Sequence, residues 1–214
     1  MTLRDLTQLV ALGEGQHLEF KHRVPRPERI AKEIIAFANC GGGRLLLGVG
    51  DDGTLQGVRD AEEEEFALRR ALHRHSDPPV EVLTERVPIS KKRDVILVVV
   101  PASPRRPHFL VNGGPEHLAY VRVQDMSVEA SPEAVRLMRL SEHDDDVLFE
   151  FGEKEQVLMR YLDSYGRISV EQFASVAHIP VADASDTLVT LARANVLRFH
   201  TDAREDYFTL AYGG

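Results

Sequence analysis

The chain has few of the features that would place it in a specialised class of protein. It has a single cysteine, Cys40, so it can form no internal disulfide and no cysteine-cluster zinc site. Its longest apolar run, VILVVVP at 95–101, has the length of a strand and falls far short of a membrane span. The N-terminal segment lacks a basic region followed by an apolar stretch, so we expect no signal peptide. These absences predict a cytoplasmic protein that does not bind a membrane.

Two kinds of ligand site are also missing from the sequence. No segment matches a Walker-type phosphate loop, because the glycines at 41–43 precede a predicted strand, whereas such a loop leads from a strand into a helix. An ATP cofactor is therefore not supported. The histidines show no metal-ligand spacing beyond the isolated pair His73 and His75, and we interpret them as surface or structural residues.

Charge divides the chain into two parts. Residues 141–214 hold fourteen acidic and six basic residues and so account for the whole net charge of −8. Residues 1–140 are neutral. The change in charge predicts a core domain at 1–140, an acidic linker at 141–152 and a second domain at 153–214.

Periodicity in the first part predicts helices and strands in irregular alternation. We expect helices near 3–10, 27–38, 61–75 and 131–140, the second of them starting at Pro27 and stopping at the glycines after Asn39. Strands are expected near 17–21, 44–49, 80–88, 94–100, 108–111 and 118–123, and residues 55–58 are expected to be extended. This order predicts an α/β or α+β domain around a mixed sheet.

The second part is predicted to contain three helices followed by a hairpin. The helices fall near 153–165, 170–176 and 182–194, and the hairpin strands near 196–200 and 207–210. This order resembles a winged helix-turn-helix domain. Its third helix carries Asp183 and Asp186 and only one base, Arg193, which disfavours DNA binding. We interpret this domain as a protein-interaction module, with DNA binding as the alternative.

Three separated motifs in the first part occur in order with regular spacing. The residues that carry them are Glu14, Glu19, Phe20 and Lys21; Ala36, Phe37, Ala38 and Asn39 with Gly42 and Gly43; and 47–53, which reads LGVGDDG. They resemble the signature of the Schlafen family's AlbA-type core domain. The segments RPH at 106–108 and AYVRV at 119–123 extend the resemblance over about residues 10–140.

The resemblance implies a site and an activity. In nuclease members of the family, two glutamates and an aspartate form an acidic site for metal-assisted RNA cleavage, and these roles fall on Glu14, Glu19 and Asp51. Such carboxylates would hold Mg²⁺ or Mn²⁺. Gly50 departs from the pattern, since many relatives have another acid there. The structural alternative is that Glu19 pairs with Lys21 or Arg44 and that residues 51–53 form an ordinary turn.

Basic residues in the first part occur in three short groups, which predict a surface that contacts phosphates. The predicted nucleic-acid-binding residues are Lys21, Arg23, Arg26, Arg29 and Lys32; Lys91, Lys92 and Arg93; and Arg105 and Arg106. Solvated surface charge is the alternative for each group.

Two functions follow from these features. The first is a nucleic-acid-binding protein, acting on RNA or DNA through its core, that works as a metal-dependent endoribonuclease. The second is a non-catalytic transcriptional regulator that binds DNA through the winged helix. A homodimer is expected, because one core offers only short basic groups and twofold pairing would join them into a longer groove.

Overall fold

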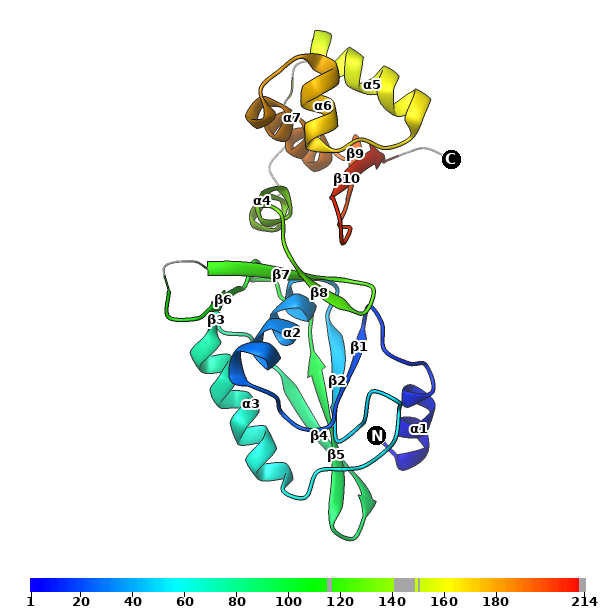
Figure 1. Cartoon of the computed structure of the whole chain (residues 1–214), viewed down its shortest axis with the longest axis vertical. Helices are drawn as coiled ribbons and strands as arrows, with labels where there is room; N and C mark the ends of the chain where they lie inside the picture. Colours follow the sequence, from blue (N-terminus) through cyan, green and yellow to red (C-terminus); the bar gives the residue numbers. More distant parts are fainter. Residues whose placement is uncertain (115–116, 141–148, 150, 212–214) are drawn as a thin grey trace. The chain divides into compact units, whose positions relative to one another are not determined.

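A computed structural model of the chain describes residues 1–114, 117–140, 149 and 151–211. The chain forms two compact units, Met1–Glu129 and Ala130–Gly214 (Figure 1). Most of the expected acidic linker, 141–152, lies outside the described residues. Within the described segments, no helix is long and apolar enough to cross a lipid bilayer.

The first unit contains three helices and eight strands. In chain order they are α1 (Leu3–Val10), β1 (Leu18–Lys21), α2 (Pro27–Asn39), β2 (Gly43–Leu47), α3 (Ala61–His75), β3 (Ser76–Asp77), β4 (Leu83–Ser90), β5 (Arg93–Val100), β6 (Phe109–Val111), β7 (His117–Val123) and β8 (Met126–Glu129). The expected mixed α/β fold class is confirmed. Strand β8 was not anticipated, and the segment expected to be extended at 55–58 makes only isolated bridges, Val49 with Leu55 and Val58 with Asp94.

Two four-stranded sheets form the frame of this unit. The first has the order β1-β2-β5-β4, in which β1 and β2 are parallel and the other neighbours antiparallel. The second, β3-β6-β7-β8, is antiparallel throughout. The first sheet is therefore mixed, and β1 and β4 are its edges.

Strand β5 shows how the first sheet is covered on both faces. Its side chains alternate, so that Val95 and Leu97 join one apolar cluster and Ile96 and Val98 join the other. The first cluster lies under α1, and the second under α2 and α3. On β1, Phe20 belongs to the α1 cluster, so its neighbour Glu19 faces the α2 side of the sheet.

Local signals set the helix ends as expected. Helix α2 has Pro27 in its first turn, where the missing N–H costs nothing. Helix α3 begins at an Asp60 cap and carries three glutamates in its first turn and His73, Arg74 and His75 in its last. This distribution of charge complements the helix dipole.

The second unit contains α4 (Pro132–Leu140), α5 (Glu153–Tyr165), α6 (Val170–Ala177), α7 (Val181–Arg193) and the hairpin of β9 (Leu197–His200) and β10 (Tyr207–Leu210). Its core is a separate apolar cluster centred on residues such as Leu158, Phe173, Leu188 and Phe208. This order of elements is the one expected at 153–210. A winged helix-turn-helix stays a prediction.

Helix α4 belongs to the second unit, although we expected the core domain to run to residue 140. Arg136 on α4 makes an ion pair with Asp186 on α7 at 2.7 Å and donates to Ser185 Oγ at 3.1 Å. Glu133 accepts a hydrogen bond from the same hydroxyl. These contacts join residues about fifty positions apart, so the local pattern of α4 gave no indication of them.

Candidate nucleic-acid interface

A buried arginine lies at the centre of the predicted acidic site. Arg122 on β7 has a fully buried side chain, and its Nη2 lies 3.1 Å from Glu19 Oε2. Its Nη1 lies 3.1 Å from Glu33 Oε2 on α2. The second oxygen of Glu19 contacts Lys21 Nζ. Glu19 is therefore paired with Lys21, as the structural alternative held, and with Arg122, which the sequence did not indicate.

The Arg122 guanidinium makes further contacts besides the two ion pairs. Its guanidinium lies 4.7 Å from the centre of the Phe37 ring and donates to Gly15 O at 2.8 Å. Ser127 on β8 contacts both Arg122 and Glu33. The Nε atom is the one buried side-chain nitrogen or oxygen in the described residues without a hydrogen-bond partner. Arg122, on β7, thus contacts residues of β1, α2 and β8 through one side chain.

Glu33 and Ser127 were not among the predicted site residues. Glu33 lies in the middle of α2, and Ser127 lies on β8, a strand that was not anticipated. Burial raises the pKa of Glu19, and the nearby carboxylates of Glu33 and Glu14 act in the same direction against Lys21. The acidic groups that reach Glu19 are therefore Glu33 and Glu14.

The other two predicted site residues lie in different settings. Glu14 is exposed, and its Oε1 accepts a hydrogen bond from Phe20 N at 2.7 Å. Asp51 is exposed on the turn after β2. The neighbouring Asp52 accepts from Thr54 N at 2.9 Å, as in an ordinary Asx turn.

These carboxylates do not fit a metal ion. No group of three or more His, Cys, Asp or Glu side chains that could hold a metal occurs among the residues the structure describes. Both oxygens of Glu19 are already taken by cations, Lys21 and Arg122. A divalent ion bound to these oxygens would have to compete with a buried guanidinium and with the Lys21 ammonium.

Two other motif positions support the fold. The Asn39 side chain donates to His108 O at 3.0 Å and to Tyr120 O at 2.9 Å, and it accepts from His108 N at 2.7 Å. The His108 ring donates through Nδ1 to Pro78 O at 2.6 Å, so its Nε2 accepts from the Ser103 hydroxyl at 2.7 Å. Burial lowers the pKa of His108, which keeps the ring neutral.

Several of the predicted basic residues are already engaged within the protein. Arg93 donates to the carbonyls of Gln56 and Gly57 at 3.0 and 2.9 Å. Arg105 pairs with Glu81 at 3.3 Å, and the Lys32 ammonium lies 4.9 Å from the centre of the Tyr120 ring. Arg106 is half-buried. These bases have local roles, whereas Lys91 and Lys92 are exposed at the β4–β5 turn.

The remaining arginines lie in the connection between β1 and α2 and in the first turn of α2. Arg23, Arg26 and Arg29 are exposed, and none of them pairs with any residue in the described part of the chain. The loop that carries them is held against α3, because Val24 N donates to Glu64 at 2.7 Å. The first basic group of the sequence therefore lies beside a helix about forty residues further along.

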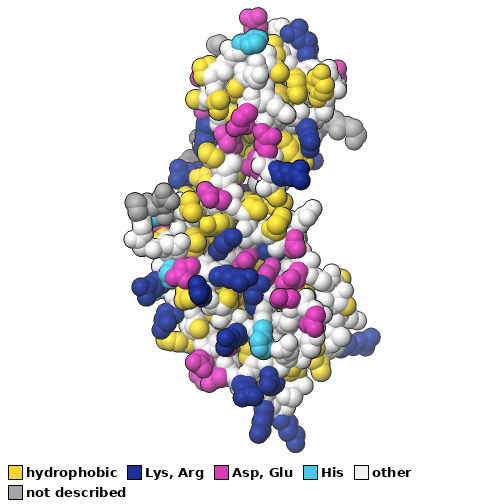
Figure 2. Space-filling model, in the orientation of Figure 1, with side chains coloured by type: hydrophobic (Ala, Val, Ile, Leu, Met, Phe, Trp, Pro, Cys, Tyr) yellow, Lys and Arg dark blue, Asp and Glu magenta, His cyan; other side chains and the backbone are white. Residues whose placement is uncertain are grey.

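Helix α3 adds a cation that the sequence analysis missed. A depression of about 550 Å³ between the loop and α3 is lined by Arg23, Arg26 and Arg70, together with Glu63 and Glu64. Figure 2 shows Lys and Arg side chains over the part of the first unit where α2 and α3 lie, with acidic side chains among them. Three unpaired guanidinium groups thus converge on one concave surface.

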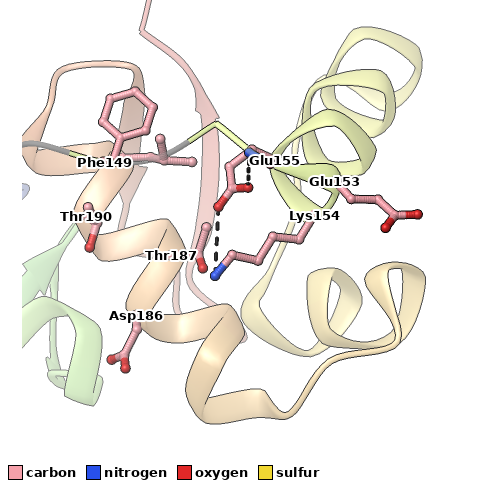
Figure 3. Close-up of a pocket in the computed structure, with 9 residues that line it drawn as sticks. Phe149, Glu153, Lys154, Glu155, Asp186, Thr187 and Thr190 are labelled. Carbon is pink, nitrogen blue, oxygen red and sulfur yellow. Dashed lines mark hydrogen bonds and ion pairs between the residues drawn. The ribbon is translucent and has the colours of Figure 1, made fainter.

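A cavity in the second unit contains the contacts at the N-terminus of α5. It has a volume of about 510 Å³ and lies between α7 and the start of α5 (Figure 3). Glu155 accepts from Gly152 N at 2.9 Å and lies 3.8 Å from Lys154 Nζ. These contacts cap the first turn of α5 and satisfy its free N–H groups. They assign no function to this cavity.

The first unit is thus a mixed-sheet domain whose motif residues, Glu19, Asn39 and Arg122, join its two sheets through buried polar contacts. A family model described as "Schlafen, AlbA_2" matches residues 14–131, more than half of the chain. The chain belongs to this Schlafen AlbA_2 family. Membership of the family points to a nucleic-acid-related function.

Two solved structures resemble the chain at low identity. The DIP2311 protein of Corynebacterium diphtheriae is 16% identical with a TM-score of 0.44, over 92% of this chain and 34% of that protein. The N-terminal domain of a RecG-related protein from Nitrosomonas europaea is 18% identical with a TM-score of 0.41, over 72% of this chain and 97% of that domain. The chain thus spans about a third of the length of the first. No curated protein matches it.

Proposed function

We propose that the first unit binds nucleic acid through the phosphate backbone, at the depression lined by Arg23, Arg26 and Arg70. The observation that carries this proposal is the convergence of three exposed, unpaired arginines from two elements on one concave surface. Guanidinium groups match phosphate oxygens in a bidentate geometry. Family membership supports a nucleic-acid ligand.

The local charge balance favours an anionic ligand. The depression also contains Glu63 and Glu64, but one oxygen of Glu64 is occupied by Val24 N. Arg74 lies one turn beyond Arg70 on α3 and is exposed, and Arg29 follows Arg26 on α2. The two helices therefore extend the positive surface beyond the depression.

We do not propose a metal-dependent step. The donor set around Glu19 does not fit a divalent ion, because Lys21 and Arg122 already contact its two oxygens. The binding function does not depend on such a step. An endoribonuclease activity would need a catalytic site other than this set of three carboxylates.

Fluorescence anisotropy on the full chain tests the proposal. Single-stranded RNA and duplex DNA of about 12 nucleotides or base pairs would be titrated at several salt concentrations. We expect Arg26→Gln/Arg70→Gln to weaken binding and to lower the salt slope by about 2, one for each lost phosphate contact. The matched control is Arg4→Gln/Arg59→Gln, which removes two exposed arginines that do not line the depression. Equal losses in both variants would contradict the proposal.

For the second unit we propose a protein-interaction role. Asp183 is exposed on α7, and Asp186 on the same helix is bound to Arg136 of α4. The hairpin loop adds Asp202 and Glu205, both exposed. A DNA duplex would meet negative charge on both elements. A fragment of residues 130–214 that bound duplex DNA at physiological salt would refute this role.

A further inference from the structure

A second cavity of the first unit lies where β1 and β2 begin. It has a volume of about 560 Å³ and is separate from the arginine depression, with which it shares no lining residue. Its polar lining includes Glu14, His17 and Arg44, and its apolar lining includes Leu9 and Leu12. Leu12 is 78% exposed and supplies an accessible apolar surface in this lining.

The polar groups of this cavity are held in place by the backbone. Glu14 Oε1 accepts from Phe20 N at 2.7 Å, and its other oxygen has no partner in the described residues. His17 donates from Nδ1 to Gly42 O at 2.9 Å, so its Nε2 is available. Arg44 is exposed and unpaired, and its backbone N–H donates to His17 O at 2.9 Å. A carboxylate, an imidazole and a guanidinium thus lie on adjoining segments.

The position of His17 depends on the glycine turn before β2. Gly42 has φ +78°, and a Cβ there would lie 2.6 Å from Val100 O. A side chain at this position would therefore clash with β5 and displace the carbonyl that holds the His17 ring. A Cβ added at Gly41 would lie 3.4 Å from Cε1 of the same ring. The glycines thus shape this cavity without forming a phosphate loop.

We propose that this cavity binds a guanine nucleotide. The unpartnered oxygen of Glu14 accepts hydrogen bonds from N1–H and the exocyclic amine of guanine, an edge on which adenine presents an acceptor at N1. The base lies against Leu12 and the His17 ring, and Arg44 binds the phosphate. The inference deepens the proposed function, because it assigns a base preference to a domain that binds nucleic-acid backbones.

Calorimetric titration of the full chain with mononucleotides tests the base preference. We expect GMP to bind at least about tenfold more tightly than AMP, because a site that accepts from N–H groups rejects a base that lacks them. IMP keeps N1–H but lacks the exocyclic amine, so its affinity falls between the two. Equal affinities for GMP and AMP, or no binding of GMP at millimolar concentration, would overturn the proposal.

Two variants test the assignment of residues. Glu14→Gln keeps an acceptor for Phe20 N but places an amide donor against the guanine edge, so the preference for GMP over AMP disappears. Arg44→Gln weakens both nucleotides equally. The matched controls Glu62→Gln and Arg59→Gln change exposed charges outside the cavity and leave the affinity for GMP unaltered. A Glu14→Gln variant that still prefers GMP refutes the role of Glu14.

The two proposals fail in different ways. If oligonucleotides do not bind but GMP does, the arginine depression is wrong and the nucleotide cavity stands. If oligonucleotides bind through Arg26 and Arg70 but GMP and AMP bind alike, the guanine site is wrong and the backbone site stands. The affinities of the wild-type chain for oligonucleotides with and without guanosine show whether both sites act on the same ligand.

Discussion

Arg122 Nη2 and Glu19 Oε2 lie 3.1 Å apart, in an ion pair whose guanidinium has no exposed surface. The two residues come from β7 and β1, which belong to different sheets. The same guanidinium also reaches Glu33 on α2. Arg122, which belongs to the motif at 119–123, thus has a structural role: its buried side chain links β7 to β1 and α2.

We expect Arg122→Met to lower the free energy of unfolding by about 3–5 kcal/mol, because Glu33 loses its cation and Glu19 keeps only Lys21. Urea denaturation followed by circular dichroism measures this change. The control is Arg105→Met, since the pair of Arg105 with Glu81 is exposed and contributes at most about 1 kcal/mol. A loss for Arg122→Met no larger than that of the control would contradict the structural role of Arg122.

His108 should make stability depend on pH. Its pKa in the folded protein is lowered by burial from the ordinary value of 6.5, so the unfolded chain binds the proton more readily. The stabilising contribution is therefore complete above about 6.5 and is lost as the pH falls through that value toward the lower folded pKa. Burial lowers the pKa of His200 in the same direction, so His108→Gln reduces the slope without abolishing it.

The measurement for His108 is a series of urea denaturation curves between neutral and mildly acidic pH. His73→Gln serves as the control, because His73 is exposed on α3 and should leave the slope unchanged. An identical pH dependence in the wild type and in His108→Gln would show that the buried imidazole does not contribute.

Divalent metal ions should leave the thermal stability of the protein unchanged. A ligand that binds the native state raises the melting temperature, and the paired oxygens of Glu19 leave no site for Mn²⁺ or Mg²⁺. Differential scanning fluorimetry with Mn²⁺ and with EDTA checks this expectation. A rise in Tm with Mn²⁺ that Glu19→Gln removes would restore the metal site predicted from the sequence.

The homodimer remains a prediction. Light scattering at micromolar concentration should give a mass of about twice 24.0 kDa, because twofold pairing would extend the positive surface of one core. The hairpin of the second unit supplies little of the contact, since Phe208 is buried and the Phe199 ring lies 5.1 Å from it. Tyr212, another aromatic of this segment, lies outside the described residues. A monomer mass would show that two cores do not pair to form a longer positive groove for nucleic acid.

The elements that were predicted correctly are those with local signals. Helix α2 starts at Pro27 and ends just before the glycines, and α3 spans the predicted residues 61–75. Helix and strand periods depend on neighbours a few residues apart. These features therefore follow from the sequence without knowledge of the tertiary structure.

Contacts between distant segments could not be predicted in the same way. The partner of Glu19 is Arg122, about a hundred residues further on, and the sequence analysis considered only Lys21 and Arg44. Arg70 was overlooked because it lies in a helix rich in charges, most of which face solvent. The site role of Asp51 stays a prediction, since regular motif spacing does not by itself bring side chains together in space.

The side-chain amide of Asn39 makes three hydrogen bonds to the backbone of His108 and Tyr120, and so joins the end of α2 to the second sheet. Losing any of these bonds would leave a buried polar group unsatisfied. Selection for folding alone would therefore preserve Asn39, His108 and Arg122, even in a protein without any catalytic side chain. A motif made of these residues therefore identifies the fold of the domain. Residues responsible for an activity have to be sought at positions that do not make such buried contacts.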